Sequence, residues 1–597
     1  MPTVAKSNAL QISTNQKKMK TSKIQTLSLA ALALISFSAC NGLKKMQKKA
    51  ETVEYTVTPN PLEMHGDSIS VTVKGKYPAK YFGKKVALTI NPKMKWNGGE
   101  KALKPITVYG EKAKDAKGTT VKYKEGGSFS YTDKIAYQPE MRNADLYYSA
   151  TGQVKSKTKE MPEKKIADGT IVTPLLTQPD DMTLIGKDKF ERVIPNSQMI
   201  EIFYLINSSQ VRPTETTKKE MKDLKTWVEN SMMNPTKYVY KGMSVSAYAS
   251  PDGELSYNAN LADDRAKSTI KYFQGMFKEK KTKFDAATQD NWYSIKTTAE
   301  DWEGFKSLME QSSIADKDLI LNVLKMYPDG EKREQEIKNL SKTYREVADN
   351  ILPKLRRSVN NLNYDVVGRT DEQLLKFATT TPDSLNLEEI LFAATLTNDL
   401  NTKLNIYKAA EKRFGNDWRT VNNVGTVLLQ LNKLGDAEAQ FNKADKMSPN
   451  NPVILNNLGI VSRWKGDRKA AMDYYKKAGT SAETKYNMGV CEILNGNYSN
   501  ALSNMGSYKT FNSALATLLS GNNDGAVAIL DGSKVKEEAI SYYLKAIAGA
   551  RKGDANMMIN NLKTAINKDA SLKEAAKTDM EFFKMRSNSE FKALVGM

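Results

Sequence analysis

The chain has 597 residues, 40% of them hydrophobic, so it is long enough for about three to four globular domains. Its 89 basic and 68 acidic residues give a formal net charge of +21, but the lysines are scattered and form no aromatic-interleaved stripe, which argues against nucleic-acid binding. One histidine, His65, and two cysteines, Cys40 and Cys491, are too few for a multi-histidine or cysteine-rich zinc site.

The same counts argue against most enzyme classes. A Ser-His-Asp or Cys-His centre would have to use His65, which has no nucleophile motif near it. The sequence contains no GxxxxGK[ST] and no strand-linked GxGxxG. We therefore expect a protein that is not an enzyme and that needs neither metal nor cofactor. Glycan hydrolysis by two carboxylates stays open, because distant Asp or Glu residues leave no local signature.

The N-terminal 40 residues have the composition of an export signal. Residues 1–18 are polar, and Lys20 and Lys23 then precede the apolar run 27–37, which is too short to span a bilayer as a mature helix. Ser-Ala-Cys follows, ending at Cys40. The sequence predicts a signal peptide over residues 1–40.

This signal resembles those of bacterial lipoproteins of the Bacteroidetes type, although Phe37 stands where leucine is usual. The resemblance implies that Cys40 is lipidated and becomes the N-terminus, which anchors the chain in the outer membrane. A plain secretory signal is the alternative. Residues 41–50 are lysine-rich and read as a solvated tether without an acidic run, so we expect the protein to face the periplasm.

Residues 51–184 are predicted to form an all-β domain. Short stretches alternate between apolar and polar residues, and turn signals separate them, as in Ile69, Val71 and Val73, and in Val86, Leu88 and Ile90. An immunoglobulin-like sandwich is the natural packing for such strands. The lysine-rich residues 155–168 are expected to be an exposed excursion or linker. Adhesion to a protein and simple spacing are both open as roles for this domain.

Residues 185–366 are predicted to form an α/β domain. An apolar run at 200–206 suits a strand, and residues 214–230 suit a helix. Residues 242–273 then read as a strand, a tight turn and a second helix. Helical residues over about 275–354 are expected to be an insertion before a last strand.

The second strand, turn and helix resemble the OmpA-like peptidoglycan-binding module, whose signature is Gly-Tyr-Thr-Asp, a Gly, Tyr-Asn, Leu-Ser and Arg-Ala. The corresponding positions, without a gap, are Ala247-Tyr248-Ala249-Ser250, Gly253, Tyr257-Asn258, Leu261-Ala262 and Arg265-Ala266. The paired arginines before Ser358 resemble the start of that module's last strand.

The resemblance implies a clamp for the diaminopimelate side chain of the peptidoglycan stem peptide. Arg265 would hold its carboxylate, and Asn258 would order the loop. The family's acidic residue, which holds the ammonium, is replaced by Ser250, which can accept a hydrogen bond but carries no charge. Asp252, two positions later, is the candidate to supply the missing charge.

Residues 376–597 contain a helical repeat. Gly425 and Gly459 lie 34 residues apart, and each is followed twelve residues later by an alanine. A third Gly follows at 489, and Phe441 and Tyr475 keep the same offset of 34 residues. This resembles the tetratricopeptide repeat, which implies paired helices and a protein partner on the concave face, with plain scaffolding as the alternative. Cys491 is expected to be a small buried hydrophobe.

Taken together, the sequence predicts a multidomain outer-membrane lipoprotein that binds peptidoglycan through the OmpA-like module and an unidentified protein through the repeats. The alternative is an assembly or scaffold component of an envelope or secretion complex whose module no longer binds the cell wall. The serine at position 250 favours the alternative, and the intact Arg265 favours the first hypothesis.

Overall fold

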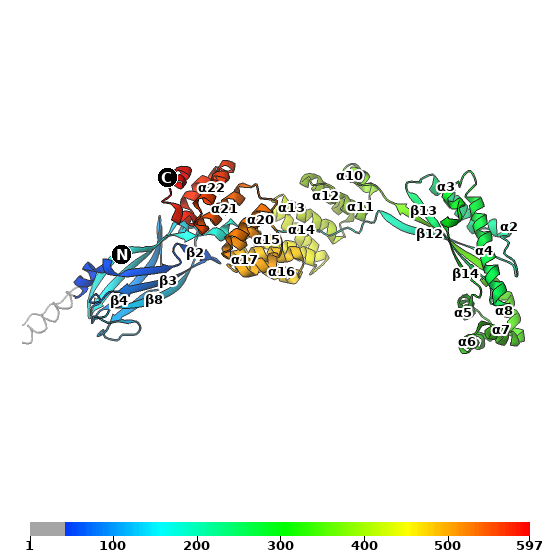
Figure 1. The fold of residues 1–597 in the computed structure, drawn as a ribbon, viewed down its shortest axis with the longest axis horizontal. Helices are drawn as coiled ribbons and strands as arrows, with labels where there is room; N and C mark the ends of the chain where they lie inside the picture. The colour runs from blue at the N-terminus through cyan, green and yellow to red at the C-terminus, as the bar shows by residue number, and fades with distance from the viewer. Residues whose placement is uncertain (1–41) are drawn as a thin grey trace, which may run out of the picture. The chain divides into compact units, whose positions relative to one another are not determined.

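The computed structural model describes residues 42–597, and these form two compact units (Figure 1). The first unit comprises the chain up to Gly186 together with Val421–Met597, and the second is Lys187–Thr420. The predicted signal peptide and Cys40 lie outside the described residues. Within the described part of the chain, no helix is both long and apolar enough to cross a membrane.

The N-terminal part of the first unit consists of two β-sheets. One sheet has the order β1-β3-β2-β11 with β8 also paired to β3, and the other has the order β10-β9-β4-β6-β7 with β5 also paired to β4. The strands are β1 (Glu54–Thr58), β2 (Leu62–His65), β3 (Ser68–Tyr77), β4 (Ala87–Trp96), β5 (Gly99–Ala102), β6 (Ile106–Gly110), β7 (Thr120–Val121), β8 (Gly127–Ala136), β9 (Asp145–Val154), β10 (Lys157–Ala167) and β11 (Thr170–Ile171). Both sheets are mixed, because β11 pairs parallel to β2 and β7 pairs parallel to β6.

The two sheets share one hydrophobic core, so this part is a β-sandwich. Val71 and Val73 of β3 are buried in it together with Leu88 and Ile90 of β4, as their alternation predicted. The predicted excursion at 155–168 is instead strand β10, paired antiparallel to β9. Lysines dominate there because this strand lies at a sheet edge, where charged side chains discourage pairing with other chains.

The segment expected to be a solvated tether also differs from its prediction. Residues 42–48 are helical, and Leu43 and Met46 are buried in the sandwich core. The sulfur of Met46 accepts a hydrogen bond from the backbone N–H of Gly83 at 3.2 Å. Leu43 and Met46 are three residues apart, so a helix places both on one face, while Lys44 and Lys45 between them give the segment the composition of a solvated tether.

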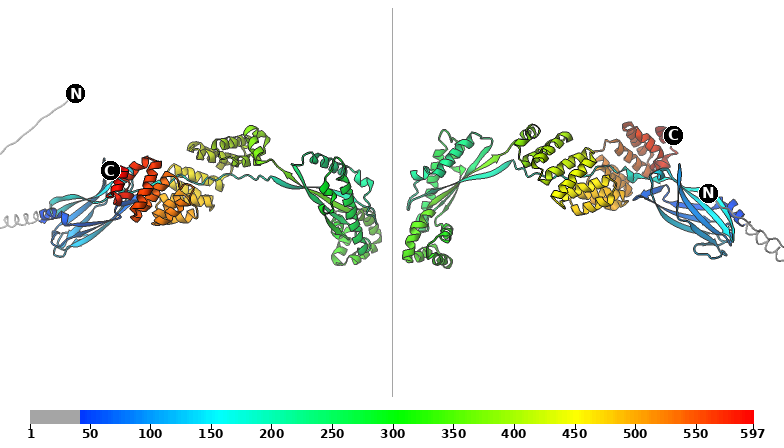
Figure 2. Two further views of the ribbon diagram at one scale, coloured as in Figure 1. Left: turned by 45° about the horizontal axis from the view of Figure 1, so that its top comes forward. Right: turned by 180° about the vertical axis from the view of Figure 1, so that it is seen from behind.

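The rest of the first unit is a series of helix pairs. Its helices are α13 (Trp418–Gln430), which begins just before the boundary, α14 (Leu434–Met447), α15 (Pro452–Trp464), α16 (Arg468–Ala478), α17 (Ala482–Leu494), α18 (Tyr498–Met505), α19 (Phe511–Leu519), α20 (Asn523–Asp531), α21 (Ala539–Lys552), α22 (Ala555–Lys568), α23 (Ser571–Thr578) and α24 (Ser589–Val595). A 3-10 turn, η7 (Met580–Met585), precedes α24. These pairs form the C-terminal helical repeat region (Figure 2).

The small residues of the repeats have the packing role that the sequence predicted. A Cβ on Gly425 would lie 2.8 Å from the ring of Phe441, and one on Gly459 would overlap the ring of Tyr475. Both aromatic side chains are fully buried between paired helices. Cys491, on α17, is buried as well, and burial raises the pKa of its thiol to about 12.

The second unit contains a four-stranded sheet with the order β12-β15-β13-β14. Its elements are β12 (Val193–Phe203), α2 (Pro213–Thr216), α3 (Lys219–Met232), β13 (Tyr238–Tyr248), α4 (Leu255–Met276), β14 (Tyr293–Thr298), α5 (Trp302–Gln311), α6 (Lys317–Met326), α7 (Gly330–Asn339), α8 (Ser341–Asn350), α9 (Leu352–Leu355) and β15 (Arg357–Val367). Three helices follow, α10 (Asp371–Thr380), α11 (Leu387–Thr395) and α12 (Leu400–Phe414).

One face of this sheet is covered by α3 and α4. Val228 of α3 and Phe273 of α4 share a core with Ile202 of β12 and Val245 of β13. The predicted insertion over about 275–354 is shorter than expected, because β14 lies within it and pairs parallel to β13. The helices α5 to α9 form a separate small core between β14 and β15.

Candidate functional site

The strand, turn and helix singled out by the sequence form one rim of the second unit's sheet. β13 ends at Tyr248, and Gly253 supplies the positive φ of 112° that the turn into α4 requires. The buried side chain of Asn258 donates from Nδ2 to the carbonyls of Ser250, at 3.3 Å, and of Gly253, at 3.4 Å. Asn258 therefore ties the start of α4 to the turn.

Arg265 lies beneath this turn and is almost entirely enclosed, with 1% of its surface exposed. Its guanidinium donates to three backbone carbonyls, those of Tyr248 at 2.8 Å, Ser208 at 3.0 Å and Leu205 at 3.2 Å. The ring of Tyr204 lies 5.2 Å from it. Burial is the main cause that lowers the pKa of Arg265 to about 10. Most of its hydrogen-bonding capacity is therefore used within the chain.

A second arginine, Arg356, reaches the turn from the residue before β15. Its Nε donates to Oγ of Ser250 at 3.2 Å, and its Nη2 pairs with Oδ2 of Asp252 at 3.3 Å. The other carboxylate oxygen of Asp252, Oδ1, is buried and has no hydrogen-bond partner among the described residues. The sequence prediction brought together Ser250, Asp252, Asn258 and Arg265, and the structure adds Arg356. The sequence prediction gave the paired arginines only as the start of the last strand and assigned Arg356 no part in the site.

The helical insertion also reaches this turn. Oε1 of Glu334, on α7, accepts a hydrogen bond from the backbone N–H of Gly253 at 2.6 Å. Glu334 in turn pairs with Lys338, one helical turn later, at 2.5 Å. The insertion therefore adds charged side chains to the edge of the site that the sequence motif does not contain.

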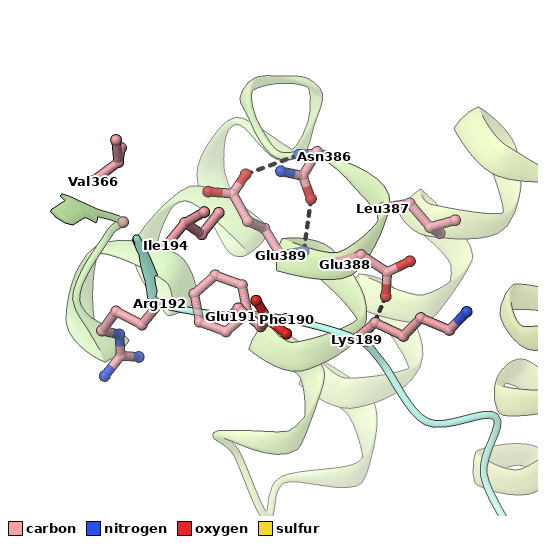
Figure 3. A pocket seen from close by; sticks show the side chains of 11 residues that line it. Lys189, Phe190, Glu191, Arg192, Ile194, Val366, Asn386, Leu387, Glu388 and Glu389 are labelled. Carbon is pink, nitrogen blue, oxygen red and sulfur yellow. Dashed lines mark hydrogen bonds between the residues drawn. The ribbon is translucent and has the colours of Figure 1, made fainter. Parts of the chain in front are cut away.

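A cavity of about 430 Å³ lies elsewhere in the second unit, where β12 begins near α11 (Figure 3). Phe190 and Ile194 form part of its lining. Two of its acidic groups are already engaged, since Glu388 accepts from the backbone of Lys189 at 2.6 Å and Glu389 closes a capping box at the start of α11. We assign no ligand to this cavity.

The repeat region carries a second constellation, which the sequence prediction missed. Four helix pairs each contribute one asparagine from their first helix, and these first helices are α13, α15, α17 and α19. Each asparagine forms hydrogen bonds with both the N–H and the C=O of a single residue in an extended segment, residues 177–186. The pairs are Asn423 with Gly186, Asn457 with Leu184, Asn487 with Met182, and Asn512 with Gln178. We call these four asparagines the ladder and residues 177–186 the strap.

Two acidic side chains of the strap are bound as well. The carboxylate of Asp181 accepts hydrogen bonds from Nε of Arg463 at 2.7 Å and from Nη2 of the same guanidinium. It also accepts one from Nε1 of Trp464 at 2.7 Å. Asp180 accepts from the hydroxyl of Tyr486 at 2.7 Å and from Asn512 of the ladder. Burial is the main cause that raises the pKa of Asp180 to about 6.

A sequence signal for the ladder exists. Each ladder asparagine lies two residues before the small residue of its repeat, at Gly425, Gly459, Gly489 and Ala514. In the described chain the strap therefore covers the side of the first helices that carries the ladder. No group of three or more His, Cys, Asp or Glu suited to a metal ion occurs among residues 42–597.

Comparison with known protein families finds no matching family, and no curated protein matches the sequence. Among solved structures, a tetratricopeptide repeat protein from Parabacteroides merdae is 17% identical and covers 41% of this chain and 99% of its own, with a TM-score of 0.27. PilW, a type IV pilus biogenesis factor, is 15% identical with coverages of 37% and 99% and a TM-score of 0.25.

YrrB, described as a tetratricopeptide protein with an unusual peptide-binding site, is 20% identical with coverages of 34% and 94% and a TM-score of 0.19. Because the scores and identities are low, we base every functional proposal on the contacts within this chain.

Proposed function

We propose that this chain is an outer-membrane lipoprotein that binds peptidoglycan through its second unit and a protein partner through its repeats. It has no catalytic role in this proposal and needs no metal or cofactor. The proposed anchor is lipidated Cys40, and the protein faces the periplasm, where the cell wall lies.

The strand order of the second unit supports the resemblance to the OmpA-like module. A β-α-β-α-β order followed by a final strand between the first and second strands places the end of β13, the start of α4 and Arg356 at one rim. Two guanidinium groups, those of Arg265 and Arg356, and one carboxylate, that of Asp252, therefore meet at the turn after β13.

The observation that carries the proposal is the unpartnered oxygen of Asp252. A buried carboxylate oxygen without a hydrogen bond is costly, and an ammonium group of a ligand would satisfy it. A ligand carboxylate would then face the remaining N–H groups of Arg265 and Arg356. The side chain of diaminopimelate carries both charges on one carbon, and it is the group we assign to this site.

Sedimentation with purified sacculi tests the proposal in the whole described chain, from residue 42 onward. We expect wild type to pellet and Asp252→Asn to bind roughly tenfold or more weakly, because the charge-assisted bond to the ammonium is lost. The matched control is Asp264→Asn, an exposed carboxylate on α4, the helix that follows the turn, and this variant should pellet like wild type. Equal pelleting of wild type and Asp252→Asn would contradict the site.

One observation favours the second candidate, an assembly protein whose module no longer binds the cell wall. Three carbonyls already occupy the guanidinium of Arg265, so this side chain is explained without a ligand. In that case wild type would stay in the supernatant with sacculi. The search for partners would then move to the surfaces of the repeats and the sandwich.

A further inference from the structure

The ladder recognises the strap through its backbone. In each of the four pairs the asparagine Oδ1 accepts from the strap N–H at 2.7–2.9 Å, and its Nδ2 donates to the strap C=O at 2.7–3.0 Å. These contacts do not depend on the strap's side chains. They therefore require an extended chain but no particular sequence.

The spacing of the pairs matches an extended chain as well. Met182, Leu184 and Gly186 are every second residue, and three successive first helices each bind one of them. An extended chain advances about 6.7 Å in two residues and turns the same backbone edge to the ladder each time. A helical or bent segment could not meet three consecutive asparagines in this way.

Sequence selection comes from the two adjacent aspartates. The side chain of Asp181 is 1% exposed and that of Arg463 8%, so this pair is shielded from water and from screening by salt. Asp180 faces Tyr486 and the ladder's own Asn512. A segment with neutral residues at both positions would leave a buried guanidinium without its partner, which is strongly unfavourable.

We propose that the ladder is a binding site for an extended peptide with two neighbouring acidic side chains, and that the strap is its resident ligand. An external partner docks there only in place of the strap. This deepens the protein-binding half of the proposed function and is independent of the cell-wall half. Sacculus binding and peptide binding are measured separately, so failure of one does not decide the other.

The probe is a fluorescein-labelled synthetic peptide with the sequence of residues 175–188, added to the whole described chain. In wild type the strap fills the site, and we expect little change in anisotropy. In a variant whose residues 177–186 are replaced by ten glycines and serines, the ladder is intact and vacant, so the peptide should bind. A peptide with asparagine at both aspartate positions should bind this variant at least tenfold more weakly.

A pair of point variants separates release of the strap from a general effect on folding. Leu184→Pro removes an N–H that bonds Asn457, whereas Thr183→Pro removes a neighbouring N–H that makes no bond to the ladder in the described structure. We expect the peptide to bind Leu184→Pro and not Thr183→Pro. Equal binding by these two variants, or no binding by the vacant variant, would overturn the proposal.

If the vacant variant is unfolded alone, added peptide should restore its helical circular dichroism, because a ligand of the folded state stabilises that state by mass action. A vacant variant that neither binds the peptide nor refolds in its presence also counts against the proposal. Binding of the peptide to wild type as tightly as to the vacant variant would show that the peptide occupies some other surface.

Discussion

Arg265 supports the fold of the second unit through its buried guanidinium, and it also belongs to the site that we propose for peptidoglycan. It is among the largest fully buried side chains of the described residues. Its carbonyl partners are Tyr248 at the end of β13 and Leu205 and Ser208 in the loop after β12. Loss of the guanidinium would leave buried carbonyls without donors. Arg265 is therefore a poor position at which to test ligand binding alone.

We predict that Arg265→Ala lowers the free energy of unfolding by about 3 kcal/mol, because it leaves both a cavity and unsatisfied carbonyls. Urea denaturation of the whole described chain measures this change. Lys267→Ala, an exposed position on the same helix, should change it by less than about 0.5 kcal/mol. If the Arg265 variant were as stable as wild type, the three hydrogen bonds would not support the fold.

Asp180 of the strap leads to a prediction about how the stability of the chain depends on pH. Its pKa is about 6 in the folded chain against an ordinary value of 3.8, so the folded state holds the proton more tightly. Its contribution to stability is fully present below the ordinary pKa and is lost as the pH rises through about 6.

Asp180→Asn should remove this dependence. Between about pH 5 and about pH 7 the loss of stability in wild type should exceed that in the variant by about 1 kcal/mol. Urea denaturation at the two pH values measures both differences. Identical pH dependence in the two proteins would mean that Asp180 is not protonated more readily in the folded chain.

At the scale of elements, the repeat helices were predictable because their signal is local. A glycine followed twelve residues later by an alanine marks a close helix pair, and the structure places Gly459 against the ring of Tyr475. The strands of the sandwich were predictable for the same reason, through alternation. Strand β10 was missed because its outward lysines obscured the buried Met161 and Ala167.

Gly459→Ala tests the helix packing. The added methyl group would overlap the buried ring of Tyr475, and we predict a loss of about 1–3 kcal/mol in the free energy of unfolding. Gly435, on α14, has open space around its Cα, so Gly435→Ala should be neutral or stabilising by up to about 1 kcal/mol. Thermal unfolding of both variants compares them, and equal melting temperatures would refute the packing argument.

At the scale of the whole molecule, the order of domains along the chain differs from the division of the chain into compact units. The sequence predicts three consecutive domains, whereas the first compact unit consists of two separate segments, with the second unit inserted between Gly186 and Val421. The sequence prediction assigns the strap, with Gln178 and Asp180, to the end of the all-β domain and the start of the α/β domain. The ladder asparagines lie 237 to 334 residues away from the strap residues that they bind, so no local pattern could reveal the pairing.

The same limit applies to the candidate site in the second unit. Motif spacing alone groups Asp252, Asn258 and Arg265, because all three belong to one turn and the helix that follows it. Arg356, about a hundred residues further along, and Glu334 of the insertion join the site only through the fold.

The most direct test of the central claim is calorimetry of the whole described chain with two soluble stem peptides. One carries diaminopimelate and the other lysine, which has the ammonium but lacks the carboxylate beside it. The account predicts that the diaminopimelate peptide binds at least tenfold more tightly, because only its carboxylate meets Arg265 and Arg356. Equal affinity for the two peptides, or no heat from either, would contradict it.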